Sequence, residues 1–120
     1  MSSSMDPSGD DRPAWVGWWR VVRYDGAVPD PPTYYDATLE SWDVIKAEAS
    51  GLYVARHPIL EVRGNTICLK DEGEDDERAE RWHAEVDGDR LRVVAASGPH
   101  EGAVGIGERI DTDPRRLASR

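Results

Sequence analysis

The strongest constraint on the fold is a pair of tight-turn sequences, Gly64-Asn65 and Asp87-Gly88-Asp89, each between two short segments of alternating apolar and polar residues. Glycine, asparagine and aspartate tolerate the positive φ angles that two-residue hairpin turns require. Alternation with a period of two places every second side chain on the same face of a strand. The two turns therefore predict antiparallel strands joined by local connections.

Segments rich in β-branched and aromatic residues extend this pattern along the chain. We expect about eight strands, at residues 18–24, 37–50, 52–56, 59–63, 66–70, 80–86, 90–96 and 103–111. Regularly spaced strands with short connections favour an all-β, antiparallel up-and-down meander that closes into a small barrel. Closure leaves the sheet without exposed edges.

Three segments interrupt or complicate the pattern. Residues 28–36 contain Pro29, Pro31 and Pro32, which predict a loop because proline disrupts regular structure. Residues 37–50 contain helix-forming Glu, Lys and Ala, but their alternation favours a strand with Ile45, Ala47 and Ala49 on one face. His57-Pro58 is expected to separate the strands at 52–56 and 59–63.

The length of 120 residues predicts a single domain. Residues 1–13 are rich in Ser, Asp, Gly and Pro, a composition that buries too little apolar surface to fold, and we expect a disordered tail. Residues 14–112 form the expected barrel. Residues 113–120 are expected to be a flexible C-terminal tail.

The net charge of −9 argues against binding to nucleic acid or to an anionic membrane, because both require a basic face. The acidity has two candidate causes, adaptation to high salt and a high-GC genome. The single cysteine, Cys68, excludes an internal disulfide and a cysteine-based zinc site. With no signal peptide and no apolar run of roughly 18 residues, we expect a cytoplasmic protein.

The opening of the first strand carries a resemblance to a known family. Gly17-Trp18-Trp19 contains a Gly-x-Trp motif before strand 18–24, Arg109 lies in the last strand, and residues 82–97 are similar to the late hairpin of short bacterial lipocalin-like domains. Together these resemble the small lipocalin-like, calycin-type barrels. The resemblance implies structural roles for Gly17, Trp19 and Arg109, in which the tryptophan closes one end of the barrel and the arginine packs across it.

Several side chains are candidates for contact with a ligand inside or at the mouth of such a barrel. Arg23 shares a face with Trp19 and Val21 in a regular strand, where it would anchor an anionic ligand or, alternatively, stay in solvent. Tyr34, Tyr35 and Trp42 flank the proline-rich loop, either as a lid or as anchors of the loop. The predicted lining comprises Val21, Arg23, Ile45, Ala47, Leu60, Val62, Leu69, Trp82, Ala84, Leu91 and Val93.

No residue set predicts catalysis, a metal or a cofactor. His57, His83 and His100 lack the spacing of a local metal pair. The acidic run 72–77 lacks the ligand order of an EF-hand loop, and Cys68 has no predicted histidine partner. Gly102, Gly105 and Gly107, spaced through a strand-like run, indicate β-bulges or close backbone approach rather than phosphate binding.

The sequence therefore favours a lipocalin-like domain that binds a small apolar or amphipathic ligand within the barrel. The alternative is a protein–protein interaction module with a filled core and no ligand. An enzyme on the same barrel, such as an isomerase, is the third and least favoured class, because no acid–base pair stands out. A cavity of about 300 Å³ or more would favour the first reading over the second.

Overall fold

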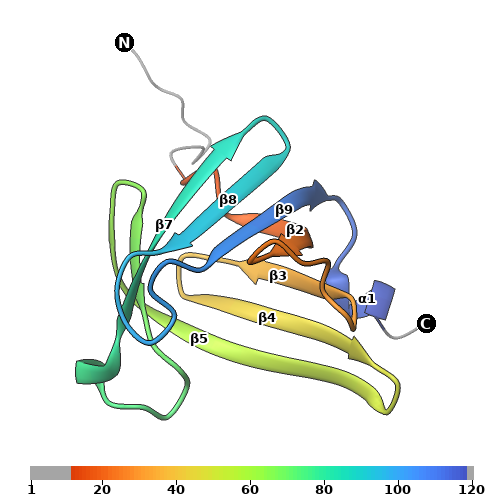
Figure 1. Cartoon of the computed structure of the whole chain (residues 1–120), viewed down its shortest axis with the longest axis horizontal. Helices are drawn as coiled ribbons and strands as arrows, with labels where there is room; N and C mark the ends of the chain where they lie inside the picture. Colours follow the sequence, from red (N-terminus) through yellow and green to blue (C-terminus); the bar gives the residue numbers. More distant parts are fainter. Residues whose placement is uncertain (1–11, 119–120) are drawn as a thin grey trace.

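The computed structural model describes residues 12–118 and consists of one closed antiparallel barrel (Figure 1). The strands within this range are β2 (Gly17–Tyr24), β3 (Thr33–Ala37), β4 (Ser41–Glu48), β5 (Gly51–Arg63), β6 (Thr66–Leu69), β7 (Glu80–Asp87), β8 (Arg90–Ala95) and β9 (Val104–Ile110). Each strand pairs with the next along the chain, and β9 pairs back with β2. The expected all-β meander of eight strands, closed into a barrel, is confirmed.

Two strand assignments differ from the sequence-based expectation, although the total agrees. β3 begins within the predicted loop at 28–36, because the prolines precede it and its Thr-Tyr-Tyr sequence has high strand propensity. β5 runs unbroken through His57-Pro58. Pro58 is tolerated where β5 changes partners, since pairing with β4 ends at Pro58 and pairing with β6 begins at Ile59. The total is unchanged because β3 was not predicted and β5 was predicted as two strands.

The predicted strand within 37–50 is confirmed as β4, which runs from Ser41 to Glu48. Residues 1–11 of the predicted N-terminal tail lie outside the described residues. At the other end, Pro114–Ala118 form a short helix, α1, packed outside the barrel against β2, β3 and β4 (Figure 1). Residues 119–120 of the predicted C-terminal tail lie outside the described residues.

Helix α1 is held in place by ion pairs from Arg115. Asp36 on β3 and Asp43 on β4 are directly opposite one another, so their carboxylates lie side by side on the outer face of the barrel. Arg115 Nη1 lies 2.7 Å from Asp36 Oδ2, and its Nη2 lies 3.1 Å from Asp43 Oδ2. The guanidinium offsets the repulsion between two like charges across adjacent strands. These ion pairs connect α1 to the outer face of β3 and β4.

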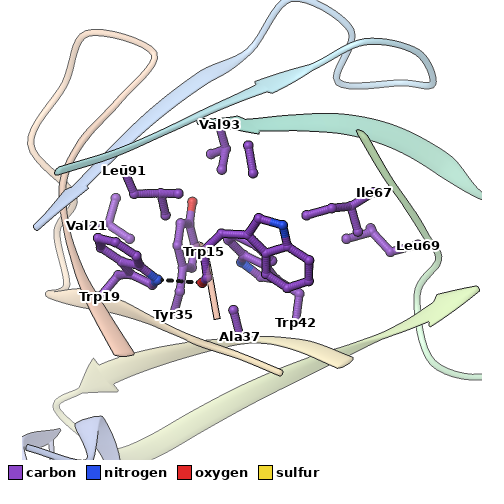
Figure 2. Close-up of a cluster of buried hydrophobic side chains, with 11 residues drawn as sticks. Trp15, Trp19, Val21, Tyr35, Ala37, Trp42, Ile67, Leu69, Leu91 and Val93 are labelled. Atoms are coloured by element: carbon purple, nitrogen blue, oxygen red, sulfur yellow. Dashed lines mark hydrogen bonds between the residues drawn. The ribbon is translucent and has the colours of Figure 1, made fainter. Parts of the chain in front are cut away.

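Trp19 and Arg109 join the first and last strands at one end of the barrel, where they are directly opposite in the β2–β9 ladder. The Arg109 guanidinium carbon lies 4.2 Å from the centre of the Trp19 ring. Arg109 also donates hydrogen bonds to the carbonyl oxygens of Ala14 and Val16, at 2.8 and 3.4 Å. Trp19 Nε1 donates to the carbonyl oxygen of Trp15 at 2.9 Å (Figure 2). These contacts fold the segment before β2 across the barrel end and close it.

Gly17 is required at this closure for two reasons. Its φ of +144° lies in a region that residues with a side chain rarely adopt. A Cβ atom there would also lie 2.7 Å from Arg109 Nη1, so a side chain would push the guanidinium off its carbonyl partners. The Gly-x-Trp sequence thus has a direct steric basis.

Aromatic rings fill the interior just above the closed end (Figure 2). The ring centres of Trp15 and Trp42 are 5.7 Å apart, and those of Tyr35 and Trp42 are 5.3 Å apart in an edge-to-face arrangement. Such pairs add attraction beyond the area that they bury. The part of the barrel next to the closed end is therefore a packed core and not a pore.

We expect Trp19→Ala to lower the free energy of unfolding by about 3–5 kcal/mol, because it removes a fully buried indole and leaves a cavity. Urea denaturation followed by circular dichroism measures the loss. Leu39→Ala is the control: its side chain is 50% exposed, so we expect a change within about 0.5 kcal/mol. Equal unfolding midpoints for the two variants would contradict the closing role of Trp19.

Candidate functional site: the barrel cavity

A cavity of about 630 Å³ occupies the barrel beyond the aromatic core. Side chains of β2 to β8 form its wall, and the connections around residues 25–32, 70–79 and 96–103 surround its mouth. The lining residues are Val21, Tyr24, Ala27, Val28, Pro29, Asp30, Pro31, Thr33, Tyr35, Trp42, Val44, Lys46, Tyr53, Ala55, His57, Ile67, Leu69, Asp71, Glu80, Trp82, Val93 and His100. The deep part is apolar and aromatic, whereas the charged groups lie towards the mouth.

Two glycines on β9 leave room for the deep wall. A Cβ atom at Gly105 would lie 3.0 Å from Val93 Cγ2 and 3.1 Å from Tyr35 Oη. A Cβ atom at Gly107 would lie 3.3 Å from Trp19 Cβ. Of the two features expected from the sequence at these glycines, bulges or close approach, the close approach is present, because side chains of β2, β3 and β8 lie near their backbone.

Tyr35 places a hydroxyl group in the apolar wall. Its side chain is buried, and the hydroxyl has no hydrogen-bond partner among residues 12–118. Burial, with a smaller contribution from the nearby Tyr24, raises the pKa of Tyr35 well above its ordinary value. The phenol therefore stays protonated and can donate a hydrogen bond to a molecule in the cavity.

His57 joins β5 to the connection after β6 at the mouth of the cavity. Its Nδ1 lies 3.0 Å from the carbonyl oxygen of Trp42, which can only accept, so Nδ1 carries the hydrogen and donates it. Its Nε2 lies 3.3 Å from Asp71 Oδ1. The imidazole thus fixes the position of the loop that begins at residue 70.

A second histidine–carboxylate contact lies at the start of β7. His100 Nδ1 is 3.3 Å from Glu80 Oε1, and the same oxygen accepts a hydrogen bond from Trp82 Nε1 at 3.3 Å. The rings of His100 and Trp82 are in tilted contact, with centres 6.4 Å apart. This contact holds the β8–β9 connection against the barrel.

The structure brings together three of the five ligand-binding candidates predicted from sequence. Tyr35, Trp42 and Trp82 line the cavity, whereas Arg23 and Tyr34 do not. Tyr34 alternates with the buried Tyr35 on β3, so its side chain lies on the outer face of the strand.

Arg23 lies outside because strand β2 is irregular. A β-bulge between Val21 and Arg23 shifts the alternation by one residue, so Tyr24 takes the inward position that a regular strand would give to Arg23. Arg23 is exposed and donates a hydrogen bond to the carbonyl oxygen of Gly26 at 3.4 Å. Arg23 is therefore a surface residue, and the predicted cationic anchor for an anionic ligand does not lie in the cavity wall.

The wider predicted lining divides into three groups. Four of its residues line the cavity: Val21, Leu69, Trp82 and Val93. Three others are in the aromatic core or packed against it: Val62, Ala84 and Leu91. The remaining residues face outward, for reasons that differ between strands.

Ile45 and Ala47 occupy the outer face of β4, because the alternation on that strand is the reverse of the predicted one. Ile45 is fully buried, but it shares the face of Asp43, which Arg115 of α1 covers. Leu60 is 41% exposed, next to a second bulge in β5. When both faces of a strand are buried, the alternation of apolar residues does not indicate which face points into the barrel.

Two lining residues on β4, Val44 and Lys46, were missed by sequence reasoning for the same reason. Trp42, Val44 and Lys46 alternate along the inner face of β4, and the latter two were assigned to neither a lining nor a site. A lysine between two apolar positions reads as the solvent side of a strand. Tyr24 was missed because the bulge in β2 has no sequence signature.

The remaining titratable candidates have ordinary surface contacts. His83 is exposed, with its Nδ1 2.9 Å from Thr66 Oγ1, and Cys68 is a half-buried free thiol. Within residues 12–118, no three His, Cys, Asp or Glu side chains are grouped as a metal site requires. None of the helices in that same range is long and apolar enough to span a membrane.

The fold is that of a lipocalin-like β-barrel, and comparison with known proteins agrees with the structure at this level. A solved structure described as a lipocalin-like protein from Bacteroides uniformis ATCC 8492 is similar, with a TM-score of 0.56 and 16% sequence identity over 79% of this chain and 97% of that chain. The resemblance inferred from Gly17, Trp19 and Arg109 is confirmed at this level. No family model matches the sequence, and no curated protein matches it.

The raised pKa of Tyr35 predicts a defined alkaline behaviour. The neutral phenol is favoured on folding, so its contribution is complete below the unfolded pKa of about 10 and is lost as the pH rises above that value. By pH 11 we expect the wild-type chain to lose about 1 kcal/mol more stability than Tyr35→Phe, relative to pH 8. Urea titrations at both pH values measure this difference. Parallel losses in the two proteins would show that the hydroxyl is hydrated.

Proposed function

We propose that this protein binds a small apolar or amphipathic molecule inside the barrel. The observation that carries the proposal is the cavity of about 630 Å³, which lies within the range of about 300–1,000 Å³ typical of small-molecule sites. The alternative, an interaction module with a filled core, requires side chains to occupy this space, and they occupy only the part next to the closed end.

The chemistry of the wall supports the choice of ligand class. Val21, Ile67, Leu69 and Val93 supply aliphatic surface, and aromatic side chains supply the rest of the deep wall. Apolar surface of this kind is poorly hydrated, so an apolar molecule that enters it gains the free energy of leaving water. The Tyr35 hydroxyl adds one polar contact within the wall, which suits a ligand with a hydrogen-bond acceptor.

Access is through the end of the barrel away from Trp19. The lining residues Ala27 to Pro31 come from the β2–β3 connection, and Val28 is 72% exposed. An apolar side chain at the rim of a cavity lowers the cost of passage for an apolar ligand. The closed end offers no such route, because Trp15 and Trp19 are buried there.

The test uses the uncharged fluorescent probe N-phenyl-1-naphthylamine and two matched variants on β5. Ala55 lines the cavity, whereas its neighbour Val54 faces outward and is 39% exposed. We expect the probe to bind to the wild-type protein with enhanced fluorescence. Ala55→Trp should weaken binding at least about tenfold by filling the cavity, and Val54→Trp should leave it unchanged.

Absence of probe binding to the folded wild-type protein would count against the proposal. So would equal binding by Ala55→Trp and Val54→Trp, because the probe would then sit outside the barrel. Circular dichroism of both variants checks that each retains the β-fold.

A further inference from the structure

We propose that the ligand is an amphipathic anion, a carboxylate attached to an apolar body, and that its head group pairs with Lys46 at the mouth of the cavity. This inference rests on the proposed ligand-binding function and specifies the class of molecule that the barrel accepts. The observation behind it is a cationic side chain in the cavity wall that has no partner within the described part of the chain.

Lys46 lies on the inner face of β4, opposite Thr33 of β3 and Tyr53 of β5. Its side chain is half-buried and lines the cavity with both of those residues. It makes neither an ion pair nor a hydrogen bond with any residue from 12 to 118. The other lysine of the chain, Lys70, lies outside the cavity and bonds to Glu74 O and Asp76 Oδ1, at 2.7 and 2.8 Å.

An ammonium group on a partly dry wall has lost some of its hydration without gaining a counter-ion. Such a group is stabilised most by an anion that completes its shell with a charge-assisted hydrogen bond. The Thr33 hydroxyl does not fill this role, because it donates to the carbonyl oxygen of Pro31 at 3.0 Å. The space next to Lys46 is thus chemically suited to a carboxylate oxygen from outside the protein.

The acidic groups of the lining either have partners of their own or lie in solvent. Asp71 is already in contact with His57, and Glu80 with His100 and Trp82. Asp30 is exposed on the β2–β3 connection, where water screens it. The net charge of −9 repels anions at long range, but at physiological salt the screening length of about 8 Å weakens the repulsion from distant charges.

The position of Lys46 also sets the direction in which the ligand lies. Lys46 is two residues before the end of β4 at the open end of the barrel, whereas Val21 and Val93 lie deeper in the cavity. A ligand with its carboxylate at Lys46 therefore points its apolar body towards Tyr35 and the aromatic core. The charged head stays near solvent, which limits the cost of removing it from water.

The experiment compares three molecules with the same twelve-carbon chain and different heads: dodecanoate, dodecanol and dodecylamine. Isothermal titration calorimetry at neutral pH and physiological salt measures each affinity below the micelle concentration. We expect dodecanoate to bind most tightly to the wild-type protein. Lys46→Met should weaken dodecanoate by about tenfold while changing dodecanol by less than about twofold.

Two controls separate the local contact from overall charge and from folding. Arg23→Met removes a positive charge from the outer face of the neighbouring region, and it should leave the dodecanoate affinity unchanged. Lys46→Arg keeps the charge and should retain the preference for the anion. If Lys46→Met proves unstable by circular dichroism, Lys46→Gln makes the same test with a polar side chain.

The outcomes distinguish this inference from the proposed function. If all three molecules bind with similar affinity and Lys46→Met weakens none selectively, the anion inference is overturned and ligand binding stands. Tighter binding of dodecylamine would also overturn it and would assign the mouth to a cation at Asp30, Asp71 and Glu80. If none of the three binds and the neutral naphthylamine probe also fails, the proposed function itself is overturned.

Discussion

The contact between Trp19 and Arg109 is the interaction on which the rest of this structure depends. It lies at the one seam where strands distant in sequence must meet, because every other pairing in the barrel joins consecutive strands. Arg109 also holds the carbonyl groups of Ala14 and Val16, so the same side chain fixes the segment that carries Trp15 into the barrel end. Without this closure the sheet has two free edges and no enclosed interior. The cavity is thus enclosed by the β2–β9 pairing, of which this contact is one part.

Most of the architecture was predictable from local signals. Tight-turn residues and period-two alternation are encoded within a few positions of each other, and they predict the hairpins directly. The strand predictions that were wrong concern proline. Pro58 was read as a break, but a strand can contain proline where it exchanges one neighbour for another. The loop predicted around Pro29, Pro31 and Pro32 ends sooner than expected, because β3 begins at Thr33. Both errors arise because the partner strand, and not the local sequence, decides what proline disrupts.

The candidate site was less predictable than the fold, because it depends on which face of each strand is the interior. The bulge after Val21 reverses the alternation within β2, and it exchanges Arg23 for Tyr24. On β4 the helix α1 buries the outer face, so Ile45 has the exposure of a core residue on the side away from the cavity. The sequence pattern therefore predicts that Lys46 faces solvent, whereas in the barrel it lines the cavity. Only long-range packing distinguishes these cases.

The inner surface of β9 has a further consequence for how such a barrel changes its contents. Gly105 and Gly107 have no side chain, and Val93, Tyr35 and Trp19 approach the space that a Cβ atom would take there. A methyl group at either position would press on these side chains. A change that narrows the interior can therefore be made on this strand, by replacing either glycine with alanine.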